Sequence, residues 1–336
     1  WPTIDVRTIE AVEVAPIETP GDLNRIVVTG GISEVPVWMK ERIIENGFVI
    51  APIGEERNQE LMKIERHGNE LHPTSLGPVS FGPVDIMESE PKPLTALEII
   101  DLIKEYQIGG IIYSQGGPVR QAKLDNELQR LAKIPMLISM DAEWGLSMRL
   151  DSTFAFPWNM TLGAIKDNKL IEQAGRQIGE HCKRLGVHLN FAPVVDINTN
   201  PKNPIIGNRS FGEDRDNVTN KSLAFMKGMQ DAGILANAKH FPGHGDTETD
   251  SHKTLPTIDF DEKRIDSVEM YPYKKLIKEG LSSVMVAHLN VPSLEKRSKY
   301  PSSLSTHIVT DILRNSLEYN GLIISDALHM KGAADF

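Results

Sequence analysis

The segment of residues 239–256, KHFPGHGDTETDSHKTLP, holds a dense group of side chains that can transfer protons. Asp250 and His252 lie two positions apart, so in an extended segment both side chains point to the same side. A carboxylate beside an imidazole fixes the tautomer of the ring and raises its basicity, as proton transfer requires. Prolines and glycines in the same segment predict a bent loop that carries this pair.

From residue 93 onward the sequence alternates between helical and strand-like segments. The strand-like segments are apolar on both sides, which is typical of a parallel sheet covered by helices. The expected helices span residues 97–106, 121–132, 170–185, 217–231, 268–279 and 306–317, and the expected strands span 109–114, 136–141, 187–192, 234–240, 283–290 and 321–326.

A polar side chain stands at or just past the end of every expected strand. In a β/α barrel all these ends surround one cavity, whereas in a doubly wound sheet only those near a switch point form a site. Polar groups at every end therefore favour a barrel. The residues at the ends are Gln115, Asp141, Asp196, Lys239 with His240, His288 and Asp326.

This second segment, residues 93–336, resembles the β-N-acetylglucosaminidase branch of glycoside hydrolase family 3. The loop carries the pattern K-H-F-P-G-H-G-D-T-x-x-D-S-H-x-x-x-P, and three further words agree: MDAEWGLSMRL (140–150), IGNRSFGED (206–214) and IISDALHMKG (323–332). The resemblance implies a (β/α)8 TIM-type barrel of α/β class. It also implies that Asp326 is the nucleophile, His252 the general acid/base and Asp250 the partner of that histidine.

The resemblance further implies a set of residues that bind the sugar: Asp141, Arg149, Arg209, Lys239 and His240. If Asp326 lies near Lys239, Arg149 and Arg209, its carboxylate would be ionised at neutral pH, as a nucleophile must be. We expect a retaining exo-β-N-acetylglucosaminidase that removes terminal GlcNAc from cell-wall or chitin-type oligosaccharides in two steps. Two alternatives stay open: a β-N-acetylglucosaminide phosphorylase, and a non-catalytic sugar-binding or assembly module.

Several neighbouring residues have more than one interpretation. We expect Glu143 and Trp144 to shape the mouth of the pocket and Asp196 to hold a loop through hydrogen bonds. His288 fits pocket lining and packing equally well. The histidines and aspartates of the 239–256 loop could suggest a zinc site, but the family pattern explains them without metal, so we expect neither a metal nor a cofactor.

The barrel has only six recognisable units. The family's first strand, with a word like KIGQLFM, is not found, and the chain ends at Phe336, before an eighth strand. We expect the missing strands to come from the N-terminal segment or from a homodimer that exchanges elements.

The first segment, residues 1–92, has a different texture. It predicts strands at 25–29, 48–52, 60–64 and 79–81, a helix at 37–46 and a proline-punctuated linker at 87–93. Its words RIVVTGG (25–31), GFVIAPIG (47–54), QELMKIER (59–66) and SLGPVSFGPV (75–84) resemble the C-terminal part of protein-L-isoaspartate O-methyltransferases. The glycine-rich loop of that family is absent, so we expect a small α/β fragment without methyltransferase activity.

Composition limits the partners. The formal net charge of -10 argues against nucleic acid or an anionic membrane surface as the main partner. The single cysteine, Cys182, excludes an internal disulfide and is expected to be a buried helix residue. No apolar run approaches the length of a membrane helix, and no signal segment opens the chain. The compartment, cytoplasmic or periplasmic, therefore stays open.

Overall fold

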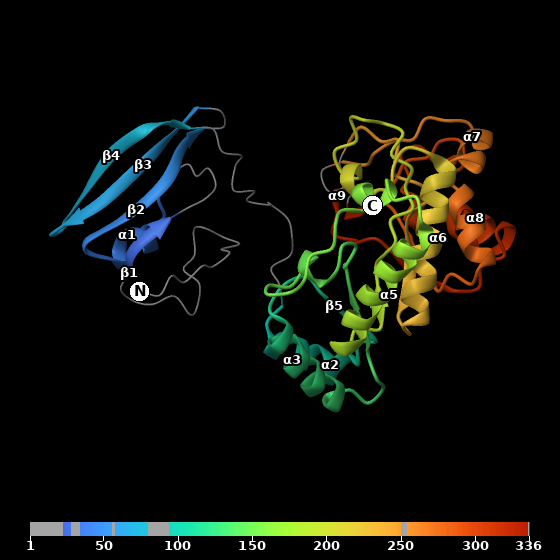
Figure 1. Cartoon of the computed structure of the whole chain (residues 1–336), viewed down its shortest axis with the longest axis horizontal. Coiled ribbons are helices and arrows are strands. Elements are labelled where there is room, and N and C mark those ends of the chain that lie inside the picture. Colours follow the sequence, from blue (N-terminus) through green and yellow to red (C-terminus); the bar gives the residue numbers. More distant parts are fainter. Residues whose placement is uncertain (1–22, 28–33, 56–57, 80–93, 250–253, 335) are drawn as a thin grey trace. The chain divides into compact units, whose positions relative to one another are not determined.

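The computed structural model describes residues 23–27, 34–55, 58–79, 94–249, 254–334 and 336 (Figure 1). The chain divides into two compact units, Trp1–Glu90 and Pro91–Phe336. Each unit has hydrophobic clusters of its own.

The first unit is a four-stranded sheet with one short helix. Its strands are β1 (Leu23–Val27), β2 (Ile43–Glu55), β3 (Asn58–His67) and β4 (Glu70–Val79), in that order across the sheet. β1 runs parallel to β2, and the other neighbours are antiparallel. Helix α1 (Val37–Arg42) buries Trp38 and Met39 in a cluster with Val49 and Ala51 of β2.

Two expectations for this unit were wrong in their boundaries. The helix expected over 37–46 ends at Arg42, and the chain continues as β2 from Ile43. Ile43 is β-branched and buried in the sheet cluster, so pairing in the sheet overrides the local helical pattern. The strand expected at 79–81 is instead the end of β4, and residues 80 and 81 lie outside the described residues, as does the expected linker up to Pro93.

The second unit contains a six-stranded sheet in which every neighbouring pair is parallel. The order across the sheet is the order along the chain, as in part of a barrel wall. Its strands are β5 (Gly110–Tyr113), β6 (Leu137–Met140), β7 (Leu189–Asn190), β8 (Leu235–Phe241), β9 (Ser283–Val286) and β10 (Leu322–Ser325).

Each strand follows a helix, which confirms the six expected units. These helices are α2 (Ala96–Tyr106), α3 (Pro118–Leu131), α5 (Asn168–Arg184), α6 (Arg215–Asp231), α8 (Tyr271–Lys278) and a π-helix, η4 (His307–Ser316). In Figure 1, α2 and α3 lie together, α5 lies beside α6, and α8 lies on the other side of α6. Shorter helices not expected from the sequence are α4 (Asn159–Gly163), α7 (Glu262–Ser267), α9 (Lys331–Ala334) and three 3₁₀ turns, η1 (Leu146–Met148), η2 (Gly207–Arg209) and η3 (Ser302–Leu304).

Side-chain capping explains where the main helices begin. Thr95 accepts a hydrogen bond from the backbone of Glu98, whose carboxylate accepts one from the backbone of Thr95, so α2 starts with a capping box. Asp167 and Asp214 accept backbone hydrogen bonds in the same way at the starts of α5 and α6.

The two faces of the parallel sheet bury different clusters. On the helix-covered face, Ile138, Met140 and Ala236 belong to a large cluster that includes Ile178 and Cys182 of α5. On the other face, a smaller cluster contains Leu189, Phe191 and Met285, with Leu137, Leu235 and Ile324 packed against it. This alternation is that of strands buried on both sides, as the apolar sequence pattern predicts.

Among the described residues, strands β1 to β4 form one sheet and β5 to β10 form another, which ends at β5 and β10. What completes the barrel stays a prediction. Among the described helices, none has both the length and the apolar character needed to cross a bilayer.

Candidate active site

The polar residues expected at the strand ends lie along one edge of the parallel sheet. Asp141 directly follows β6, Lys239 and His240 lie in the last three residues of β8, and Asp326 directly follows β10. Because the strands are parallel, these carboxyl ends share the same edge, where α/β enzymes bind their ligands.

Asp141 is held by two cations. Its Oδ1 lies 2.7 Å from Nζ of Lys239, and its Oδ2 accepts a hydrogen bond of 2.6 Å from Nη2 of Arg149. Burial alone would raise the pKa of Asp141, but these two neighbours hold it well below its usual value. The carboxylate is therefore ionised, and it keeps 21% of its side-chain surface exposed, against 32% for Arg149.

Glu143 forms a second, deeper layer beneath this pair. Its side chain is fully buried, with Oε1 2.7 Å from Nζ of Lys239 and 2.7 Å from Nη2 of Arg209. Arg209 Nε donates a further bond of 3.0 Å to Oε2, so the guanidinium contacts both carboxylate oxygens. Burial opposes ionisation, yet Arg209 and Lys239 lower the pKa of Glu143 to about 2. Lys239, only 2% exposed, thus joins both carboxylates.

Asn190, at the end of β7, positions the segment that carries these carboxylates. Its Oδ1 accepts a hydrogen bond from the backbone N–H of Ala142 at 2.9 Å, and its Nδ2 donates to the carbonyl of the same residue at 3.1 Å. A fully buried amide therefore satisfies both backbone groups between Asp141 and Glu143.

His240 is held between an aspartate and an arginine. Its Nδ1 lies 2.7 Å from Oδ2 of Asp196, and its Nε2 lies 3.3 Å from Nη2 of Arg209. Since a guanidinium can only donate, Nε2 accepts and Nδ1 carries the proton that Asp196 receives. Both ring nitrogens are thus engaged inside the protein.

Asp196 also fixes the loop after β8. Its Oδ1 accepts hydrogen bonds from the backbone N–H groups of His240 and His244, at 3.2 Å and 2.7 Å. This agrees with the expectation that Asp196 holds a loop, and it adds the contact with the His240 ring. His244 is buried, its Nδ1 lies 2.7 Å from Oγ1 of Thr247, and burial together with the nearby His240 lowers its pKa to about 4.

Asp326 is half-buried at the end of β10. Its backbone N–H donates to the carbonyl of Val286, and its Oδ1 accepts a hydrogen bond of 2.8 Å from the backbone N–H of Ala327. His288, fully buried after β9, lies with Nε2 2.9 Å from the carbonyl oxygen of Ala327 and Nδ1 2.6 Å from Oγ of Ser303. A carbonyl only accepts, so His288 donates from Nε2 and anchors the turn that follows Asp326.

The three cations expected near Asp326 also serve other carboxylates. Lys239, Arg149 and Arg209 form ion pairs with Asp141 and Glu143. Within the described residues Asp326 forms no ion pair. Asp250 and His252, the expected acid/base pair, lie outside the described residues.

Sequence reasoning missed part of this arrangement. Asn190 carried no signal beyond its position at a strand end, and Glu143 was assigned to the pocket mouth although it is a buried member of the ion-pair network. The acidic residue two positions after Asp141 could have suggested that role, because side chains two apart in an extended segment share a face. Among the described residues, no group of three or more His, Cys, Asp or Glu side chains is arranged to hold a metal ion.

Two protein families and several known relatives match this chain in sequence. Residues 79–336 match the sequence model described as "Glycosyl hydrolase family 3 N terminal domain", and residues 16–88 match that of "Protein-L-isoaspartate(D-aspartate) O-methyltransferase". A β-hexosaminidase A from Pseudoalteromonas piscicida is 36% identical over 262 residues, which cover 71% of this chain and 44% of that protein.

Two solved structures extend this similarity. A glycoside hydrolase family 3 β-N-acetylglucosaminidase from Paenibacillus sp. str. FPU-7 is 41% identical with a TM-score of 0.68, covering 71% of this chain and 47% of that one. A β-glucoside phosphorylase is 28% identical with a TM-score of 0.67, covering 70% and 44%. The chain therefore spans less than half the length of each of these three relatives.

Proposed function

We propose that this chain, which belongs to glycosyl hydrolase family 3, removes terminal N-acetylglucosamine from β-linked oligosaccharides and retains the configuration of the sugar. The observation that carries the proposal is the common edge at which Asp141, Lys239 and Asp326 lie, at the carboxyl ends of β6, β8 and β10. The names of the relatives support N-acetylglucosamine as the sugar.

The proposed roles follow from exposure and charge. Asp141, Arg149 and Arg209 are the partly exposed members of the ion-pair network, so they are placed to bind the hydroxyl groups of the terminal sugar. Lys239 and Glu143 are buried below them and hold Asp141 in place. His240 and Arg209 complete the sugar-binding set, with Asp196 fixing the ring of His240.

The proposed reaction has two steps. Asp326 attacks the anomeric carbon while His252 donates a proton to the departing glycosidic oxygen, which gives a glycosyl ester on Asp326. His252 then takes a proton from water, whose oxygen attacks the same carbon and releases Asp326. Asp250 orients the imidazole throughout and stabilises its protonated form, which is present before the first step and again after the second.

The sharpest test is the replacement of the nucleophile. Asp326→Ala should lower the turnover of 4-nitrophenyl N-acetyl-β-glucosaminide by roughly 10³-fold or more, because no covalent intermediate can form. Azide added to this variant should restore release of nitrophenol and give a glycosyl azide of inverted configuration. Asp101→Ala, at an exposed position of α2, is the matched control and should keep full activity. Full turnover in Asp326→Ala would contradict the assignment.

Replacing His252 tests the acid/base role separately. In His252→Ala, cleavage of chitobiose should be lost more completely than the first turnover of the nitrophenyl glycoside, because nitrophenol departs without help from an acid. Equal losses for both substrates would argue against His252 as the acid. A folded wild-type chain that binds chitobiose without turning over either substrate would support a sugar-binding module instead.

Phosphate is the second candidate acceptor, because one structural relative is a β-glucoside phosphorylase. Within the described residues, however, Lys239, Arg149 and Arg209 all pair with carboxylates, which leaves these three cations already neutralised. We therefore favour water. Product analysis with and without phosphate decides: formation of N-acetylglucosamine 1-phosphate would favour the phosphorylase.

A further inference from the structure

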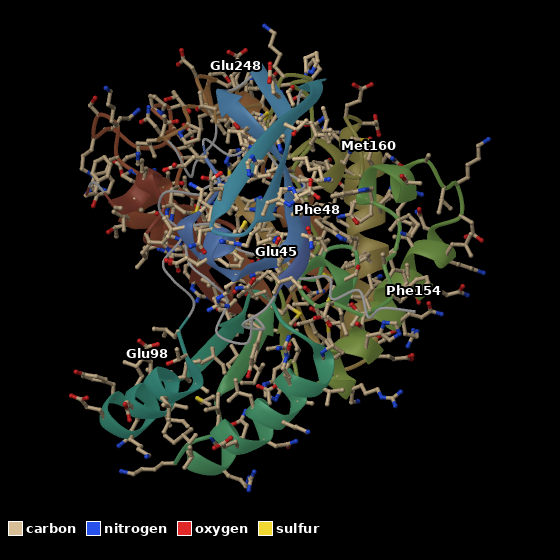
Figure 2. All side chains as sticks on the ribbon, turned by 90° about the vertical axis from the view of Figure 1, so that its left-hand side faces the viewer. Glu45, Phe48, Glu98, Phe154, Met160 and Glu248 are labelled. Carbon is tan, nitrogen blue, oxygen red and sulfur yellow. The ribbon has the colours of Figure 1, made fainter. Side chains whose placement is uncertain are left out.

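An aromatic pair, Trp144 and Trp158, lies next to the proposed site. Trp144 directly follows Glu143, and Trp158 directly precedes α4. Their ring centroids are 4.2 Å apart with the planes tilted by 44°. Trp158 keeps 45% of its surface exposed, and Phe154 on the same segment keeps 65%. Phe154 is labelled in Figure 2. Exposed apolar side chains gathered in this way mark binding surfaces more often than isolated ones do.

The ion-pair network of the site also fixes the aromatic pair. Arg209 contacts the carboxylate of Glu143, the neighbour of Trp144. The backbone carbonyl of Arg209 accepts a hydrogen bond of 2.8 Å from Nδ2 of Asn159, the neighbour of Trp158. One arginine therefore anchors the chain beside each tryptophan, and the pair is positioned by the same groups that position Asp141.

A backbone hydrogen bond also holds the segment around Phe156 against Trp144. The backbone N–H of Phe156 donates to the carbonyl of Trp144 at 3.0 Å. Between them Gly145 adopts a φ of +91°, and a Cβ there would lie 2.8 Å from the Phe156 ring. A side chain at this position would push Phe156 away, so the glycine allows the close approach that holds the segment together.

We propose that the aromatic pair binds the second sugar ring of the substrate, the ring on the leaving-group side of the bond that is cleaved. A pyranose ring carries apolar C–H groups on its faces and hydroxyl groups at its rim. The segment after β6 offers a matching combination, because it carries the partly exposed aromatic pair together with Asp141 and Arg149, whose polar side chains stay partly accessible. This inference rests on the proposed glycosidase function and extends it to the oligosaccharide chain.

The experiment compares two substrates that share the terminal sugar. N,N′,N″-triacetylchitotriose places a sugar ring on the leaving-group side, whereas methyl N-acetyl-β-glucosaminide places only a methyl group there. Trp158→Ala should lower the ratio of the two kcat/KM values, trimer over methyl glycoside, by roughly tenfold. Trp158→Phe keeps a flat ring and should retain most of the ratio, whereas Trp158→Leu should lose it.

Tyr106→Ala is the matched control, because Tyr106 is an exposed aromatic residue at the end of α2 in the same unit. It should leave the ratio unchanged. An unchanged ratio in folded Trp158→Ala would overturn the inference. If that variant also showed weaker self-association on size-exclusion chromatography, the aromatic pair would be a contact with a second copy of the chain instead. If Trp158→Ala does not fold, as judged by circular dichroism, Trp158→Leu takes its place.

Failure of the proposed function gives a different result. A wild-type chain that cleaves neither substrate would contradict the glycosidase proposal. Calorimetric titration of the trimer into the wild type and into Trp158→Ala still tests the aromatic pair in that case. Roughly tenfold weaker binding to the variant would support the sugar site, and equal binding would overturn it.

Discussion

At the scale of single residues, the site is a set of buried charges that satisfy one another. Lys239 joins Asp141 to Glu143, and Arg209 joins Glu143 to His240. Removing one partner of such a network leaves a buried charge without compensation, which costs about 3–5 kcal/mol. The accessible surface of Asp141 and Arg149 is therefore supported by Lys239 and Glu143, which are buried and need not touch the substrate.

His244 gives a pH prediction whose sign can be worked out. Burial and the neighbouring His240 lower its pKa from 6.5 to about 4 in the folded protein. Between these values the unfolded chain binds a proton that the folded chain does not, so the free energy of unfolding falls as the pH falls from 6.5 toward 4. From pH 7 to pH 5 the loss from this residue should be roughly 2 kcal/mol.

Urea unfolding at pH 7 and pH 5 measures this loss. The free energy of unfolding should differ less between the two pH values in His244→Gln than in the wild type. His329→Gln, at an exposed position after β10, should behave like the wild type. At pH 5 and above, the contribution of His244 to the pH dependence is separated from the contributions of Asp141 and Glu143. Their lowered pKa values add stability that is lost only as the pH falls below the ordinary carboxylate range. Equal pH differences in all three proteins would contradict the prediction.

At the scale of elements, helices α5 and α6 approach each other through glycines. A Cβ added to Gly228 of α6 would lie 1.9 Å from the carbonyl oxygen of Glu172, and one added to Gly175 of α5 would lie 2.3 Å from that of Phe225. These carbonyls belong to the facing helix backbones and cannot move aside as a side chain could. The close contact between the two helices therefore depends on the missing side chains.

Gly228→Ala should destabilise the second unit by about 1–3 kcal/mol, because the methyl group overpacks the helix contact. Alanine is the better helix former by up to about 1 kcal/mol, so a net loss identifies the contact as the cause. Thermal unfolding measures the change. Gly109→Ala is the control, since a Cβ there meets nothing within 4 Å, and its melting temperature should stay within a degree or two. A Gly228→Ala protein at least as stable as the wild type would refute the argument.

The sequence predicted elements well where one local pattern dominated. All six helix-then-strand units of the second part are present, because strands buried on both faces and amphipathic helices give strong and distinct patterns. The helix expected over 268–279 is the shorter α8, which starts at Tyr271 ahead of Pro272, and a separate short helix, α7, precedes it. Pro272 fits the first turn of a helix but not its interior, and this signal could have corrected the boundary.

The site was predictable in its membership but less so in its pairing. The positions of Asp141, Lys239 and Asp326 at strand ends follow from the pattern of the sequence. Which cation pairs with which carboxylate depends on the distances between strands, which no local pattern contains. The roles of Asp326, His252 and Asp250 stay predictions, and so does a homodimer that exchanges elements.

At the scale of the whole molecule, each of the two units has its own hydrophobic clusters. Met39 and Val49 belong to the cluster of the first unit, whereas Ile178 belongs to that of the second, and these clusters share no residue. The described residues that we assign to the site all follow Pro91, in the second unit. Since cooperative unfolding follows a shared core, we expect the two units to unfold in two steps.

Scanning calorimetry of the whole chain tests this expectation with one variant in each core. Met39→Ala and Ile178→Ala each remove a buried side chain and should cost about 2–5 kcal/mol in their own unit. Each should therefore lower one transition and leave the other in place. Met39→Ala should also keep wild-type turnover of the nitrophenyl glycoside below the transition of the second unit, because the described residues that we assign to the site all lie in the second unit. A single transition that moves in both variants would show that the two units unfold together, and loss of turnover in folded Met39→Ala would show that the first unit supports the site.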